Sequence, residues 1–101
     1  MLAAPVVGDD EFTLPLSDSR VLLTLTVYRD KPASYPKRVV HDTKKPDADN
    51  LAKSVIDGIV RGEIIKDDAM ITDLTVRKRY ADDEHPAGVL VDLTAVKVEV
   101  P

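Results

Sequence analysis

Residues 44–68 read KKPDADNLAKSVIDGIVRGEIIKDD, an amphipathic pattern with acidic residues on both sides of it. Its apolar residues form two neighbouring rows at helical spacing, as in a helix that packs on one face; they are Leu51, Ala52, Val55, Ile56, Ile59 and Val60. Either Asp49 or Asn50 suits the N-cap, and Gly62 is expected to end the helix in the left-handed conformation. We therefore predict a helix over residues 50–61.

Acidic residues flank this helix in a way that suggests a cation site. Pro46 keeps the preceding segment extended, and there Asp47 and Asp49 alternate, which places both side chains on the same side of the backbone. A helix of about 12 residues rises about 18 Å, and about six extended residues span about 20 Å. A chain that doubles back after Gly62 therefore brings Asp68 to the other two acids. Clustered carboxylates repel unless a cation lies between them, and oxygen ligands favour Mg²⁺ or Mn²⁺ over zinc.

Each acid taken alone also has a structural interpretation, as an N-cap, a solvated complement to the helix dipole or a turn residue. A calcium-binding domain is a second alternative, because Asp47, Asp49 and Asp57 superficially resemble an EF-hand loop. Leu51 stands where that loop has a third ligand, and Ala52 stands where it has glycine. Calcium-dependent folding without any effect on DNA would support this alternative.

Two motifs, DADNLAKSVIDGI at residues 47–59 and KDDAMITDLTVRKRY at residues 66–80, resemble the signature of the RusA family. These are small Holliday-junction endodeoxyribonucleases, often carried by prophages. The family pattern is Asp-x-Asp-Asn-Leu-x-Lys, an apolar helix, Asp-Asp-Ala-x-Ile and a basic strand. The resemblance covers roughly the C-terminal three quarters of the chain. The matching residues are Asp47, Asp49, Asn50, Leu51, Lys53, Asp57, Asp67, Asp68, Ala69 and Ile71.

The resemblance implies a homodimeric, Mg²⁺-dependent nuclease, with Mn²⁺ as a substitute, that cuts four-way DNA junctions symmetrically in recombination and repair. The implied site residues are Asp47, Asp49 and Asp68 as metal ligands and Lys53 as a catalytic lysine. Asn50 is expected to orient the acids or cap the helix, and Asp67 is expected either to support the ligands without binding the metal or to be a spare ligand. Branched DNA is the implied partner.

RusA-like chains begin with a strand that carries a basic segment, followed by a further helix, before the strand we expect at residues 20–28. Much of that region has no counterpart here, so the N-terminal part of the family domain is expected to be shortened. This leaves two alternatives open, a catalytically inactive junction-binding module and a truncated prophage remnant.

With 101 residues, 44% of them hydrophobic, the chain suits one small domain over residues 1–101. The absence of cysteine excludes a disulfide framework, a thiol nucleophile and a thiolate zinc site. The apolar run at residues 2–7 is too short for a signal sequence or a membrane span. We therefore expect a cytoplasmic protein without a membrane partner, in which residues 1–11 are flexible.

The net charge of −4 is unevenly distributed. Between Tyr28 and Tyr80 there are 12 Lys and Arg against 9 Asp and Glu, whereas the rest of the chain has 2 against 9. Basic residues in this central part are expected to contact DNA phosphates; they are Lys37, Arg38, Lys44, Lys45, Arg77 and Arg79. DNA binding should therefore depend steeply on salt and on divalent cations.

The expected strands are residues 12–16, 20–28, 69–80 and 89–100. The second should be central because both its faces are largely apolar or β-branched, whereas Pro15 restricts the first to an edge. In the last strand the apolar positions change phase near Thr94 and Ala95, which predicts a bulge or a break. The fold class is α+β, a small, mainly antiparallel or mixed sheet of three to four strands with one principal helix on one face.

Overall fold

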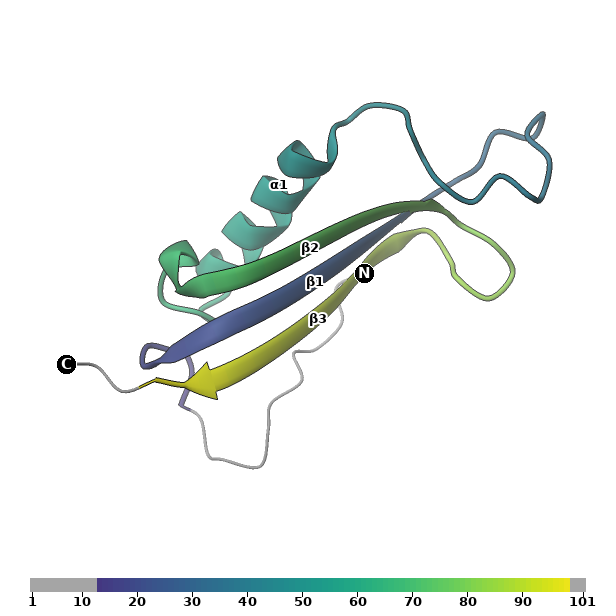
Figure 1. Cartoon of the computed structure of the whole chain (residues 1–101). Coiled ribbons are helices and arrows are strands. Elements are labelled where there is room, and N and C mark those ends of the chain that lie inside the picture. The colour runs from purple at the N-terminus through teal and green to yellow at the C-terminus, as the bar shows by residue number, and fades with distance from the viewer. Residues whose placement is uncertain (1–12, 99–101) are drawn as a thin grey trace.

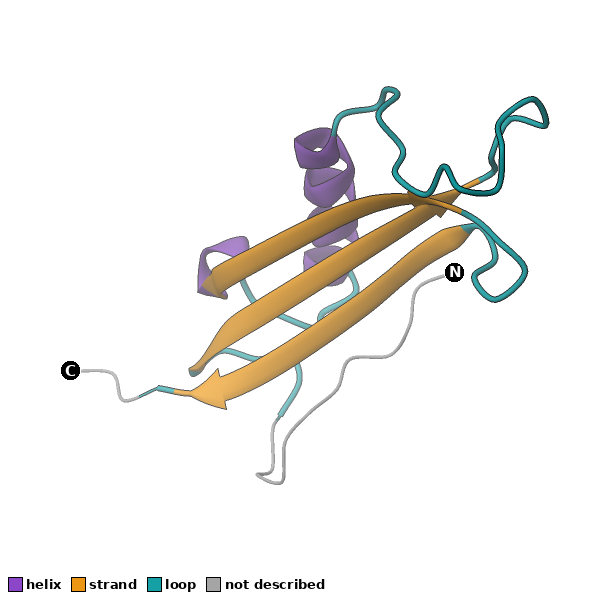
Figure 2. Ribbon diagram, turned by 45° about the vertical axis from the view of Figure 1, so that its right-hand side comes forward, coloured by secondary structure: helices purple, strands orange, loops and turns teal. Residues whose placement is uncertain are grey.

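The computed structural model describes residues 13–98, which form a three-stranded sheet with one long helix on one face (Figures 1 and 2). In chain order the elements are β1 (Ser19–Arg29), α1 (Ala48–Arg61), the short 3-10 helix η1 (Asp68–Met70), β2 (Ile71–Tyr80) and β3 (Gly88–Lys97). The predicted α+β class is confirmed. Residues 1–11, for which flexibility was expected, and Phe12 lie outside the described residues.

The sheet is mixed, with the strand order β2-β1-β3. The strand β1 is central, as predicted; it pairs in parallel with β2 and antiparallel with β3. A parallel pair requires a long crossover connection, and α1 lies within that connection, on one side of the sheet (Figure 2). None of the helices formed by residues 13–98 is long and apolar enough to cross a membrane.

The core lies between α1 and the sheet. Alternate residues of β1 and β3 point toward the helix, as the pleat of a strand requires, and α1 adds residues from its apolar stripe. The buried cluster contains Leu16, Val21, Leu23, Leu25, Ala52, Ile59, Ile65, Val91, Leu93 and Ala95. Full burial of one such Leu or Ile side chain contributes about 1.5–3 kcal/mol to the free energy of unfolding.

The helix begins earlier than predicted. Its first residue is Ala48, and Asp47 is the N-cap residue, with extended backbone angles and no side-chain cap hydrogen bond. The expectation of an extended segment through Asp49 and of a cap at Asp49 or Asn50 is therefore wrong. The preference of Asp and Asn for caps is similar at all three positions, so the sequence could not select among them.

The helix ends in a Schellman motif, in which the residue after the C-cap has the left-handed conformation. The helix ends at Arg61 with Gly62 as its C-cap, so the predicted stop at this glycine is confirmed. Gly62 has φ −76°, however, and the left-handed residue is Glu63, with φ 60°. The N–H of Glu63 donates to the carbonyl oxygen of Val60 at 3.0 Å, and that of Ile64 donates to Ile59 at 3.2 Å. The chain then turns toward η1.

The bulge or break predicted in the last strand is absent from the described pairing of β3. Its register with β1 is continuous from Gly88 opposite Tyr28 to Lys97 opposite Ser19. Val96 therefore follows the alternation onto the face away from α1, where it is 40% exposed. The irregularity lies instead in the pairing of β1 with β2, between Val21 and Leu22.

Of the predicted first strand the structure describes residues 13–16, and of these only Leu16 forms a β-bridge with another segment. Leu16 forms an isolated parallel bridge with Ile65. The N–H of Leu16 donates to the carbonyl oxygen of Ile64, and the N–H of Lys66 donates to that of Leu16, both at 2.9 Å. This bridge holds the segment between α1 and η1 against the start of the described chain.

Candidate active site between α1 and β2

A groove of about 520 Å³ separates α1 from β2. Its lining residues are Asp49, Ala52, Lys53, Ile56, Asp57, Asp68, Ile71, Leu74 and Val76. Asp49, Lys53 and Asp57 follow one another at intervals of four along α1, and residues at this spacing lie on one face of a helix. The groove therefore combines an apolar lining with carboxylates and one lysine.

Asp67 and Asp68 place two neighbouring carboxyl groups at the start of η1. Asp67 Oδ1 accepts from the N–H of Ala69 at 2.9 Å, so Asp67 caps this short helix. This bond, together with one from the Asp68 side chain, lowers the pKa of Asp67. The same side-chain bond, desolvation and the negative charges of Asp67 and Asp57 raise the pKa of Asp68.

Asp68 lies near Asp57, since both residues also line an adjoining cavity of about 320 Å³. Eight residues of helix rise about 12 Å, so Asp57 is about two turns from Asp49. The returning chain does not run fully extended, because the Schellman turn, the Leu16 bridge and η1 use part of its length. Asp68 consequently returns to the middle of α1 and not to its N-terminus.

Asp47 is exposed and is not among the residues that line the groove. Because Asp49 belongs to the helix, the two acids do not share the extended alternation that was expected, and residues two apart on a helix do not face each other. Asn50 is exposed in the first turn, two residues after the start of α1. Within residues 13–98 no three Asp, Glu or His side chains lie close enough together to hold one metal ion.

The predicted DNA-contacting residues fall into two groups. Lys37, Arg38, Lys44 and Lys45 are exposed in the loop between β1 and α1; this loop extends beyond the end of the sheet and leads into the helix (Figure 1). Val76 lines the groove, so alternation along β2 places Arg77 and Arg79 on the opposite face of the sheet. One straight segment of DNA cannot cover both faces.

Sequence reasoning did not include Asp57 among the site residues. The signal was present, because Asp49, Lys53 and Asp57 are spaced by four residues within a helix that had been predicted. The apolar residues of β2 that line the groove, Ile71, Leu74 and Val76, gave no such signal, since their partner is a helix far away in sequence.

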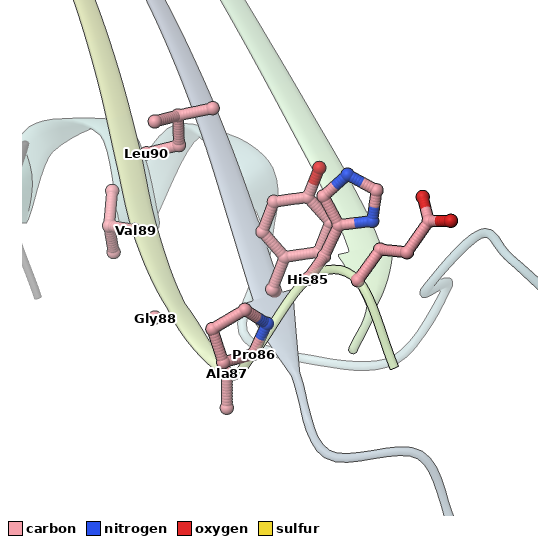
Figure 3. A pocket seen from close by; sticks show the side chains of 8 residues that line it. His85, Pro86, Ala87, Gly88, Val89 and Leu90 are labelled. Atoms are coloured by element: carbon pink, nitrogen blue, oxygen red, sulfur yellow. The ribbon is translucent and has the colours of Figure 1, made fainter. Parts of the chain in front are cut away.

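A smaller cavity of about 200 Å³ lies at the other end of the sheet, where β1 meets the loop before β3 (Figure 3). Tyr28 and His85 stack there, with ring centroids 4.9 Å apart and an angle of 4° between the planes. His85 is held by Asp82, whose Oδ1 lies 2.9 Å from the ring Nδ1 and accepts from the backbone N–H at 2.7 Å. Asp82 therefore organises this loop.

The groove is lined by residues from both sequence motifs, residues 47–59 and 66–80. A comparison with known protein families identifies the family to which these motifs belong. The family model described as endodeoxyribonuclease RusA matches residues 6–94. This range extends beyond the two motifs and includes β1 and most of β3. No curated protein and no solved structure gives a significant match to the chain. The chain belongs to the RusA family of Holliday-junction endodeoxyribonucleases.

Proposed function

We propose that this chain, as a single RusA-like domain, is a Mg²⁺-dependent endodeoxyribonuclease that resolves four-way DNA junctions in recombination and repair. The observation that supports it most is the shared groove of Asp49, Lys53 and Asp68, which come from two separate motifs. Family membership supports the reaction class, hydrolysis of phosphodiester bonds within DNA.

The carboxylates of the site suit a hard cation, but too few of them lie close together to surround a metal ion. Carboxylate oxygens are preferred by Mg²⁺ and Mn²⁺, and we propose Asp47, Asp49 and Asp68 as the ligands. No three acids within residues 13–98 are close enough to act together. Mg²⁺ is often held by one or two carboxylates together with substrate phosphate oxygens, so a DNA phosphate is the proposed complement to Asp49 and Asp68.

When bound, Mg²⁺ supplies a water of lowered pKa and offsets negative charge on the phosphate. The protein residues orient the substrate around it. Lys53 lies one helical turn after Asp49 in the groove and is proposed to donate to a phosphate oxygen, since a charge-assisted bond is stronger than a neutral one. Asp67 caps η1 and thereby fixes the backbone that carries Asp68. Asn50 is proposed to orient the neighbouring acids.

Of the basic residues predicted to contact DNA, we propose Lys37, Arg38, Lys44 and Lys45, because their loop leads directly into α1. Arg77 and Arg79 face away from the groove and are left out of this set. A homodimer with twofold symmetry would place two such grooves on a junction that is itself nearly twofold symmetric, and this would explain paired cuts.

The test is incubation of the full chain with a synthetic four-way junction and with linear duplex of the same sequence, in Mg²⁺, in Mn²⁺ and in EDTA. The proposal predicts paired nicks in the junction, none in the duplex, and none in EDTA. A junction that is bound but stays intact with either metal would contradict the catalytic claim. That result would identify the chain as a junction-binding module without catalysis.

A further inference from the structure

Asp42, in the loop between β1 and α1, carries a buried charge that the proposed chemistry does not use. The residue is 5% exposed, and its side chain is 0% exposed. A buried carboxylate is costly unless it is paired and hydrogen-bonded. Asp42 Oδ2 lies 3.2 Å from Arg29 Nε, and Oδ1 accepts from the N–H of Lys44 at 2.9 Å.

The same partners hold the backbone of the segment that precedes the helix. Arg29 Nη1 donates to the carbonyl oxygen of Lys45 at 2.5 Å, and Lys78 Nζ donates to that of Lys44. The N–H of Tyr80 donates to the carbonyl oxygen of Val40 at 2.8 Å. Residues 40–45 are therefore fixed to the ends of β1 and β2.

Tyr80 closes the other side of this cluster. It is 5% exposed, and its ring makes an edge contact with Tyr35 at a centroid distance of 5.7 Å. Desolvation, followed by the negative charge of Asp42, raises the pKa of the Tyr80 hydroxyl. The hydroxyl therefore stays protonated beside the Asp42 carboxylate.

The first turn of α1 depends on this loop more than on the core. Asp49 and Asn50 are exposed, and the first buried residue of the helix is Ala52. The core therefore fixes the middle and the end of α1, whereas the segment anchored at residues 40–45 fixes its start. A shift of about 1 Å in a reacting group can reduce a rate by about 100-fold.

We propose that Asp42 is a positioning residue for the nuclease reaction: paired with Arg29, it holds residues 42–47 so that Asp49 and the loop lysines meet the DNA phosphate in register. The inference rests on the proposed function, because it assigns Asp42 a role in the same groove. Asp42 itself touches neither the groove nor the substrate, and acts through the backbone of Lys44 and Lys45.

The test compares Asp42→Asn with wild type in multiple-turnover cleavage of a four-way junction at saturating substrate, which gives kcat, with junction affinity (Kd) measured separately in Ca²⁺. The Asn side chain can still accept a hydrogen bond from the N–H of Lys44, but it is uncharged and therefore leaves Arg29 without a counter-ion. We expect kcat to fall by about 10- to 100-fold while Kd changes by less than about threefold. An unchanged kcat, or a rise in Kd without a fall in kcat, would overturn the inference.

A second variant, Arg29→Lys, serves if Asp42→Asn does not fold. Lysine keeps the positive charge near Asp42 but has no planar fork to reach Lys45 as well, so kcat should still fall with Kd nearly constant. Arg20→Lys is the matched control, because Arg20 pairs with the exposed Asp73 at the other end of the same two strands, at 3.1 Å. Its kcat should equal that of wild type.

Amide hydrogen exchange over residues 40–47 separates this inference from the proposed function. Arg29→Lys should accelerate exchange in this segment and leave the core of β1 unchanged, whereas equal exchange in wild type and variant would contradict the anchor. If the wild-type chain cuts no junction, the proposed function fails, and the exchange result still decides whether the Asp42 anchor exists.

Discussion

Glu63 lies in the left-handed region, with φ 60°, at the helix end where glycine is usual. The left-handed conformation costs an L-residue about 1–2 kcal/mol, and the greater entropy loss of glycine offsets part of this. Glu63→Gly should therefore raise the free energy of unfolding by about 0.5–1 kcal/mol, measured by urea denaturation. Glu63→Ala is the control, since alanine keeps the penalty; an equal gain in both variants would contradict the explanation.

Asp82 provides a pH-dependent prediction. Desolvation acts to raise its pKa, but hydrogen bonds from the backbone and side chain of His85 and from the backbone of Glu84 hold it below the usual 3.8. A carboxyl whose pKa is lower in the folded state stabilises the fold above its unfolded pKa, and this contribution is lost as the pH falls through the folded pKa. The stability difference between wild type and Asp82→Asn should therefore shrink from pH 6 to pH 3. A difference independent of pH would contradict this account.

At the level of elements, the sequence predicted those whose hydrophobic pattern is local. The apolar stripe of residues 51–60 predicted the helix α1. The two largely apolar faces of β1 predicted that this strand is central. The start of α1 was placed two residues late because neighbouring Asp and Asn residues cap equally well. The parallel pairing of β1 with β2 was left open, since strand direction depends on a crossover and not on alternation.

The continuous register of β3 is tested by two truncations. Leu93 is 1% exposed and Val96 is 40% exposed, whereas the bulge predicted from sequence would have turned Val96 toward the core. Leu93→Ala should lower the free energy of unfolding by about 2–5 kcal/mol, and Val96→Ala by less than about 0.5 kcal/mol. A loss of similar size in both variants, measured by thermal and urea unfolding, would favour a bulge.

At the scale of the whole molecule, basic residues on the two faces of the sheet should contribute differently to DNA binding. DNA that covers the groove meets the loop with Lys44, and Arg77 faces the other way. Lys44→Ala should reduce the slope of log K against log salt by about 1, whereas Arg77→Ala should leave it unchanged. The measurement is junction affinity across a salt series in Ca²⁺. A reduced slope for Arg77→Ala would place DNA on the open face.

The candidate site was predictable where it follows a motif. Asp49, Lys53 and Asp68 were selected from sequence, and all three line one groove. Asp57 was missed as a groove residue because its proximity to Asp68 depends on where the returning chain stops. Asp42 was missed because its partners, Arg29 and Tyr80, are on strands distant in sequence. Contacts between residues far apart in the chain produce no periodic pattern in a single sequence, so they could not be predicted from it.

The most direct test of the central claim is the rate of paired cleavage of a four-way junction in Mg²⁺ by Asp49→Asn and by the control Asp92→Asn. Asp92 is an exposed residue of β3, opposite Thr24, so the control makes the same chemical change on the other face of the sheet. We predict a loss of about 100-fold or more for Asp49→Asn and the wild-type rate for Asp92→Asn. Wild-type cleavage by Asp49→Asn would contradict the assignment of the groove as the active site.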